Sequence, residues 1–88
     1  MDNEALGPRP EYGPTAVNFR CIAELKEVWR RFSWHGRAFD PSHEHAIEMI
    51  LTKIGRIATG DFKADNYEDI KGYADIARKL VEETCSIA

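Results

Sequence analysis

Apolar residues recur at helical spacing in two adjoining stretches of this 88-residue chain. Between residues 41 and 59 they stand three or four positions apart, so they share one side of a helix with about 3.6 residues per turn. They are Ile47, Ile50, Leu51, Ile54, Ile57 and Ala58. A matching set between residues 66 and 86 comprises Ile70, Tyr73, Ala74, Ala77, Leu80, Val81 and Thr84. The pattern predicts two helices that close on each other as an antiparallel hairpin.

A third helix is predicted between residues 15 and 32. Its main apolar stripe is Ile22, Leu25, Trp29 and Phe32, widened by Phe19 and Val28. We expect the aromatic residues of this stripe to lie in the core, because an aromatic stripe at helical spacing is ordinary packing. The fold class is therefore all-α, a three-helix bundle built on the antiparallel hairpin.

Residues 1–14 hold three of the four prolines, and proline cannot continue a helix interior. We expect an extended N-terminal arm here, followed by one helical domain over residues 15–88. Arg9 and Tyr12 are a cation and an aromatic of the kind that dock onto a bundle or close over a ligand. A frayed terminus is the alternative.

Composition restricts the class of partner. The chain is 43% hydrophobic and 31% charged, with a formal net charge of -3. That balance argues against a nucleic-acid polymer or a membrane surface as partner, because both are bound by clustered excess Lys and Arg. No run of about 18 apolar residues is present, so we expect a cytoplasmic protein. A chain of this size buries a modest core, which makes self-association into a homo-oligomer an expectation as well.

Polar residues accompany the hairpin's apolar seam. Lys53 and Arg56 lie one turn apart on the first helix, and the second contributes Asp65, Asn66, Asp69 and Tyr73. With a link near residue 62, Arg56 is expected opposite Asp69, and Lys53 opposite Tyr73. The patch is either an ion-pair network that fixes helix register or a pocket in which cations meet phosphate while amide and phenol groups bind a base or sugar.

Residues typical of catalysis are not arranged for it. Neither cysteine has a histidine within a helical turn, no serine stands in a recognisable elbow, and the glycines form no phosphate-binding loop. We expect no catalytic residue, no metal ligand and no cofactor.

Four motifs resemble a family of short helical proteins encoded mainly by bacteriophages. The family pattern is Arg…Tyr-Gly, Asn-Phe, Lys-x-x-Arg and Asp-Asn-x-x-Asp-Ile-x-Gly-Tyr-Ala, and the match runs from about Arg9 to Ala77. The resemblance implies phage origin and fold rather than an activity. It marks nine residues as candidates for ligand binding: Arg9, Tyr12, Asn18, Lys53, Arg56, Asp65, Asn66, Asp69 and Tyr73.

A more distant similarity is to the MazG-like all-α nucleotide pyrophosphohydrolases, which hold Mg²⁺ with two pairs of acidic residues on adjacent helices. The stretch NYEDIKGYADIA looks like the second of those helices. The preceding helix departs from the pattern, since Glu44 and Glu48 are spaced by four, and Lys53 and Arg56 stand where acids are needed. Metal-dependent hydrolysis is therefore doubtful.

Three hypotheses follow. The first is a phage accessory protein that binds a nucleotide-like anion without cleaving it, for instance to sequester a host defence signal. The second is a Mg-dependent nucleotide pyrophosphohydrolase of the MazG type. The third is an interaction module that inhibits a host protein through Trp34 and the arm, with a polar patch that is purely structural.

Overall fold

The computed structural model describes residues 13–33 and 40–87. These ranges contain three helices joined in sequence: α2 (Gly13–Phe32), α3 (Pro41–Thr59) and α4 (Ala64–Ile87). No strand occurs within these described ranges, and the chain is all-α as predicted. The expected arm lies mostly outside them, as do Arg9, Tyr12 and Trp34.

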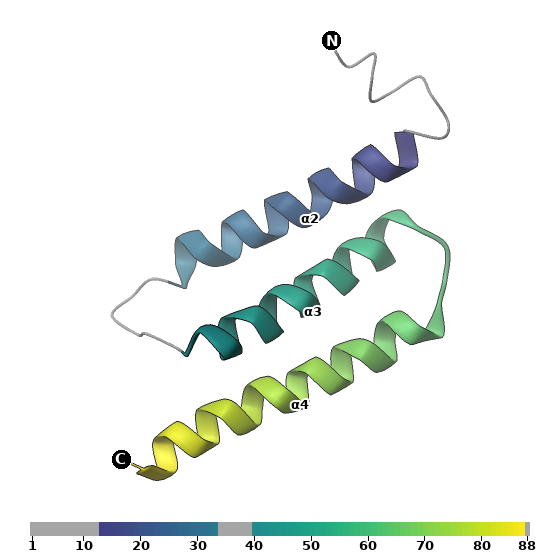
Figure 1. Cartoon of the computed structure of the whole chain (residues 1–88). Coiled ribbons are helices and arrows are strands. Elements are labelled where there is room, and N and C mark those ends of the chain that lie inside the picture. Colours follow the sequence, from purple (N-terminus) through teal and green to yellow (C-terminus); the bar gives the residue numbers. More distant parts are fainter. Residues whose placement is uncertain (1–12, 34–39, 88) are drawn as a thin grey trace.

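Local chemistry explains where α3 begins and ends. The Asp40 carboxylate accepts a hydrogen bond from the Ser42 backbone N–H at 2.7 Å, and Pro41 occupies the first turn, where no N–H is required. At the other end the Gly60 N–H donates to the Arg56 carbonyl at 3.0 Å. The chain then reverses direction through residues 61–63 (Figure 1).

Helix α4 starts two residues earlier than the sequence pattern predicts. The expected start at residue 66 rested on a capping carboxylate at Asp65, but the helix begins at Ala64 and Asp65 lies in its first turn. An earlier start shortens the link between the helices and shifts their register by about one turn. This shift decides which side chains meet across the seam.

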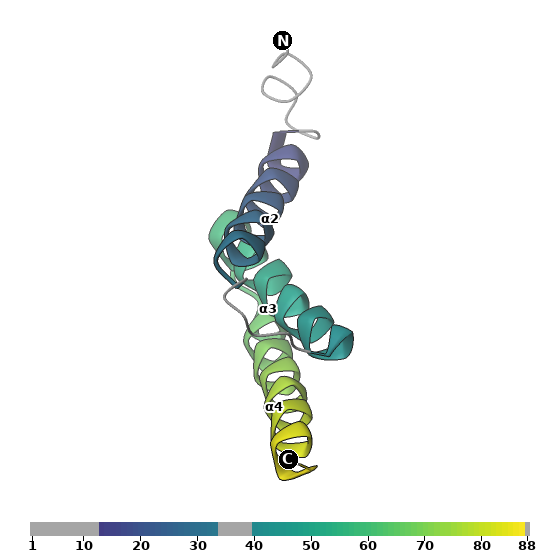
Figure 2. The same cartoon turned by 90° about the vertical axis from the view of Figure 1, so that its left-hand side faces the viewer.

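The three helices form one layer rather than a closed bundle. Helix α3 lies in the middle and packs against α2 on one side and α4 on the other, as Figure 1 shows. Within the described residues α2 and α4 make no contact with each other. Figure 2 shows the same row of helices nearly edge-on, with the helices inclined to one another. The expected three-helix bundle is therefore not confirmed.

A layer of this kind encloses little core. The buried apolar side chains of the described residues are Ala46 on α3 and Ala77 on α4. Two of the three aromatic residues expected inside are not there: Phe19 is 67% exposed and Phe32 is 64% exposed, whereas Trp29 is half-buried and donates a hydrogen bond to Glu44. That expectation was wrong because periodicity identifies an apolar face without showing what covers it.

Gly55 sets the approach of α2 to α3. It is buried, and a Cβ atom in its place would collide with the Ile22 side chain. The absence of a side chain therefore lets the two backbones pack closely. None of the described helices is long and apolar enough to cross a membrane.

Candidate anion-binding pocket

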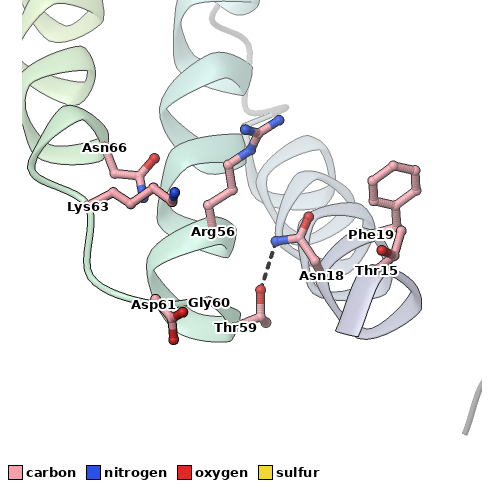
Figure 3. A pocket seen from close by; sticks show the side chains of 9 residues that line it. All are labelled: Thr15, Asn18, Phe19, Arg56, Thr59, Gly60, Asp61, Lys63 and Asn66. Carbon is pink, nitrogen blue, oxygen red and sulfur yellow. Dashed lines mark hydrogen bonds between the residues drawn. The ribbon is translucent and has the colours of Figure 1, made fainter. Parts of the chain in front are cut away.

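An open pocket of about 320 Å³ lies where the end of α3 meets the starts of α2 and α4. Its lining comes from all three helices and the α3–α4 link, as Figure 3 shows. The lining residues are Thr15, Asn18, Phe19, Arg56, Thr59, Gly60, Asp61, Lys63 and Asn66. A pocket of this size is at the lower end of the roughly 300–1,000 Å³ typical of small-molecule sites.

Asn66 is the buried polar group of this pocket. Only 6% of the residue is exposed, and its side-chain amide has no hydrogen bond to any described residue. Leaving a buried amide without a partner costs about 1–3 kcal/mol, so such groups are rare unless water or a ligand satisfies them. The Asn66 amide offers two donors and one acceptor to a molecule in the pocket.

Two cations stand beside it. The side chains of Lys63 and Asn66 extend toward Arg56 (Figure 3). Arg56 and Lys63 are exposed, and neither forms an ion pair within the described part of the chain. Lys63 directly precedes α4, whose free N–H groups add partial positive charge. The carboxylate of the link, Asp61, is turned away from these two cations (Figure 3). The arrangement favours an anion.

Asn18 has a different role from Asn66. Its Nδ2 donates to Thr59 Oγ1 at 2.7 Å and to the Gly55 carbonyl at 3.4 Å. The Thr59 hydroxyl in turn donates to the Gly55 carbonyl at 2.8 Å. These bonds tie α2 to the last turn of α3, so Asn18 fixes the wall of the pocket.

The pocket continues into a groove between α2 and α3. A second hollow of about 480 Å³ shares Phe19 and Arg56 with the first and extends past Lys26 to Arg30. Arg30 is paired with Glu48 at 3.2 Å, whereas Lys26 has no ion pair with a described residue. The groove is thus lined by an exposed aromatic ring and by cations, residue types that bind a base attached to phosphate.

The remaining predicted residues of the described ranges, Lys53, Asp65, Asp69 and Tyr73, do not line this pocket. Lys53 Nζ lies 2.9 Å from Asp69 Oδ2, with the lysine side chain 16% exposed and the aspartate 43% exposed. The expected pairing of Arg56 with Asp69 is therefore wrong. The earlier start of α4 brings Asp69 level with Lys53 and leaves Arg56 level with Asn66. The Lys53–Asp69 pair links α3 to α4 and leaves no free cation at that position.

Tyr73 also lies apart from the pocket. It lines a separate hollow of about 420 Å³ beside Pro41, Ser42 and His45, toward the opposite end of α3. The expected position opposite Lys53 is wrong for the same reason of register. Asp65 is exposed in the first turn of α4 and has no ion pair among the described residues. Of the nine predicted ligand-binding residues, Asn18, Arg56 and Asn66 line one pocket.

Sequence reasoning missed two lining residues that matter for an anion. Lys63 stands in the link, where periodicity gives no information, and Phe19 was assigned to the core. The position of Lys63 could have indicated a role in anion binding, because a cation just before a helix start adds to the partial positive charge of the helix N-terminus. Among the described residues no three His, Cys, Asp or Glu side chains are placed to hold a metal ion.

The fold and the pocket define a small all-α protein with a polar cavity at one end of its helical layer. The chain belongs to the family described as a domain of unknown function, DUF6378, which matches residues 7–81. It is also 34% identical over 70 residues to the Gene 55 protein of Mycobacterium phage L5. That alignment covers 80% of this chain and 42% of the phage protein, so the chain spans less than half of its relative. No solved structure matches.

Proposed function

We propose that this protein binds a nucleotide-like anion of mononucleotide size in the pocket beside Asn66, without cleaving it. The observation that supports the proposal most is the Asn66 amide, buried and without a hydrogen-bond partner among the described residues, beside two unpaired cations. A protein that gained nothing from this amide would be more stable with an apolar residue in its place. A ligand that bonds to it accounts for its presence.

Each lining residue has a chemical role in this proposal. Arg56 and Lys63 bind phosphate oxygens, since charge-assisted hydrogen bonds to phosphate are the strong ones. Asn66 bonds to the base or the sugar, and the exposed ring of Phe19 stacks on the base. The volume of about 320 Å³ accommodates one nucleotide unit, and longer ligands would extend along the groove toward Lys26.

The lining favours binding over metal-dependent hydrolysis. Mg²⁺ held against phosphates needs several converging carboxylate oxygens, and the described residues of this pocket offer one carboxylate, Asp61. The acidic residue that the MazG-like similarity points to, Asp69, is paired with Lys53 outside the pocket. Release of phosphate or pyrophosphate with Mg²⁺, lost in Asp69→Asn, would support the hydrolase instead.

The phage relative supplies the biological setting of the proposal. A phage protein that holds a nucleotide without consuming it lowers the free concentration of that nucleotide in the host. Sequestration of a host defence signal is therefore the role we propose. It requires affinity tighter than that of the host receptor and a protein concentration above that of the signal.

Calorimetric titration with a panel of AMP, ADP, ATP, GMP, UMP and inorganic pyrophosphate tests the proposal. We expect at least one nucleotide to bind, and Arg56→Gln to weaken it about 10–100-fold, the loss of a hydrogen bond to a charged group. Arg20→Gln is the matched control, because Arg20 is an exposed arginine of α2 paired only with Glu24. If no member of the panel binds, or if both variants weaken binding equally, the proposal fails.

Phe19→Leu separates base recognition from phosphate recognition. Stacking of a base on an aromatic side chain contributes about 1–3 kcal/mol, so nucleotide affinity should fall about 5–100-fold. Pyrophosphate, which has no base, should bind this variant as well as the wild type. An equal loss for both ligands would show that Phe19 supports the pocket rather than a base.

A further inference from the structure

The side of the helical layer opposite the pocket is apolar along α2. The side chains of Asn18, Ile22 and Trp29 mark the edge of α2 that faces α3, through their contacts with Gly55, Thr59 and Glu44. At about 100° per residue, Phe19 and Lys26 then lie on the flank with the pocket. The other flank is a stripe at spacings of four and three: Val17, Cys21, Leu25, Val28 and Phe32.

Helix α3 continues this apolar side. Gly55 and Thr59 face α2, and Lys53 faces α4, so two flanks of α3 remain. One flank includes Thr52 and Arg56, which line the groove on the pocket side. The opposite flank contains Ile47, Ile50, Leu51, Ile54 and Ala58.

Helix α4 contributes the third stripe of this apolar side. Asn66 and Ala77 are buried against α3, and Tyr73 and Ile76 line the hollow on the pocket side. The opposite flank of α4 contains Tyr67, Ile70, Ala74 and Val81. The residues named in these stripes are uncharged, whereas Lys71 and Arg78 border the stripe on α4 and the Arg31 guanidinium lies 5.5 Å from the Phe32 ring centroid. We call this surface, made of the three stripes, the apolar face.

The apolar face is too large for a free monomer. Val28 is 45% exposed, Phe32 64% and Ile54 39%, and they lie on two adjacent helices. Val17 on α2 is 56% exposed and Tyr67 on α4 is 47% exposed, so large apolar side chains of all three helices lie open on this side. Monomeric soluble proteins rarely expose a large contiguous apolar patch.

We propose that a second copy of this chain covers the apolar face. Folded domains need two packed layers around a core, and this chain supplies one layer with two buried alanines. An interface that resembles half of a domain core is typical of an obligate dimer, and a second copy is the partner present wherever the chain is made. The uncharged stripes can meet their copies directly, with Arg31, Lys71 and Arg78 at the edge of the interface.

The dimer places the two pockets on its outer sides. Because the pocket and the apolar face are on opposite sides of the layer, face-to-face association leaves both pockets open to solvent. The proposal therefore does not depend on ligand binding, and it makes the two properties separable by mutation.

Sedimentation velocity of the full chain at micromolar concentration tests the dimer. We expect wild type to sediment with twice the chain mass, and Val28→Lys to sediment as a monomer. Ala23→Lys is the matched control: it places the same charge on an exposed position of the same helix, on the pocket side, and should remain a dimer. Each new lysine also has a glutamate four residues away with which to pair, Glu24 or Glu27.

Each remaining outcome decides the proposal. A monomeric wild type, a dimeric Val28→Lys or a monomeric Ala23→Lys overturns it, as does a stoichiometric complex with a different protein in place of the homodimer. If Val28→Lys does not fold, Val28→Thr replaces it, and a dissociation constant at least 5-fold above that of wild type is then required.

Discussion

The two sides of this helical layer differ in kind. One side has cavities, cations, an exposed aromatic ring and a buried amide with no hydrogen-bond partner among the described residues. The other has apolar stripes on three helices, bordered by Arg31, Lys71 and Arg78. A buried polar group without a hydrogen-bond partner lowers the stability of the ligand-free protein. An apolar face raises stability only when another surface covers it. The comparison teaches that the first side is suited to a small polar ligand and the second to another layer of helices.

The largest expected effect comes from a charge on the apolar face. Ile54→Lys places an ammonium group in the proposed interface, which should cost about 3 kcal/mol or more and lower the melting temperature by at least about 10 °C. Wild type should melt at a temperature that rises with protein concentration, as expected when folding and association are coupled. Circular dichroism at two concentrations measures both. A melting temperature independent of concentration would contradict a dimer.

Next in size is the effect of filling the seam between α2 and α3. In Gly55→Ala the new methyl group collides with Ile22, so we expect a loss of about 1–3 kcal/mol by overpacking. Gly72→Ala is the control on α4, where a Cβ meets nothing within 4 Å. It should stabilise the helix by roughly 1 kcal/mol. Urea unfolding of both variants checks the signs, and equal effects would mean that α2 does not pack closely on Gly55.

Two asparagines of the pocket should respond in opposite directions. Asn66→Leu removes a buried amide without a partner, so the ligand-free protein should gain about 1–3 kcal/mol while nucleotide binding is lost. Asn18→Leu removes hydrogen bonds to Thr59 and Gly55 and should lose about 1 kcal/mol. Thermal unfolding without nucleotide compares them. Destabilisation by Asn66→Leu would show that the amide has a structural partner, and the proposed ligand would then be unnecessary.

The smallest effect is expected at the ion pair outside the pocket. Asp69→Asn leaves a mostly buried Lys53 without its partner, but the aspartate is 43% exposed, so we expect a cost of no more than about 1 kcal/mol. Nucleotide affinity should not change, which calorimetry can establish. A tenfold loss of affinity would return Lys53 and Asp69 to the site in which the sequence pattern grouped them.

The helices were predictable from sequence, but their arrangement was not. Apolar spacing and the Asp40-Pro41 start indicate helices directly, because both are local properties of the chain. The same spacing treats Trp29 and Phe32 alike, although Trp29 is half-buried with its indole bonded to Glu44 and Phe32 is 64% exposed. Periodicity shows that a face is apolar and leaves open whether this chain or another covers it.

The pocket was predictable only in part, because the register between α3 and α4 could not be read from the sequence. Asn18, Arg56 and Asn66 do line one cavity, while Lys53, Asp69 and Tyr73 lie outside it. An error of two residues in the start of α4 is enough to exchange the partners across the seam. Whether the lining residues bind a ligand stays a prediction until it is measured.

Native mass spectrometry of wild type and Arg56→Gln, with each nucleotide of the panel, tests both sides of the molecule together. We predict a wild-type dimer that binds two nucleotides, one at each outward pocket, and an Arg56→Gln dimer that binds none at the same concentration. A monomer, or a dimer whose nucleotide content is the same with and without Arg56, would contradict this division between the two sides.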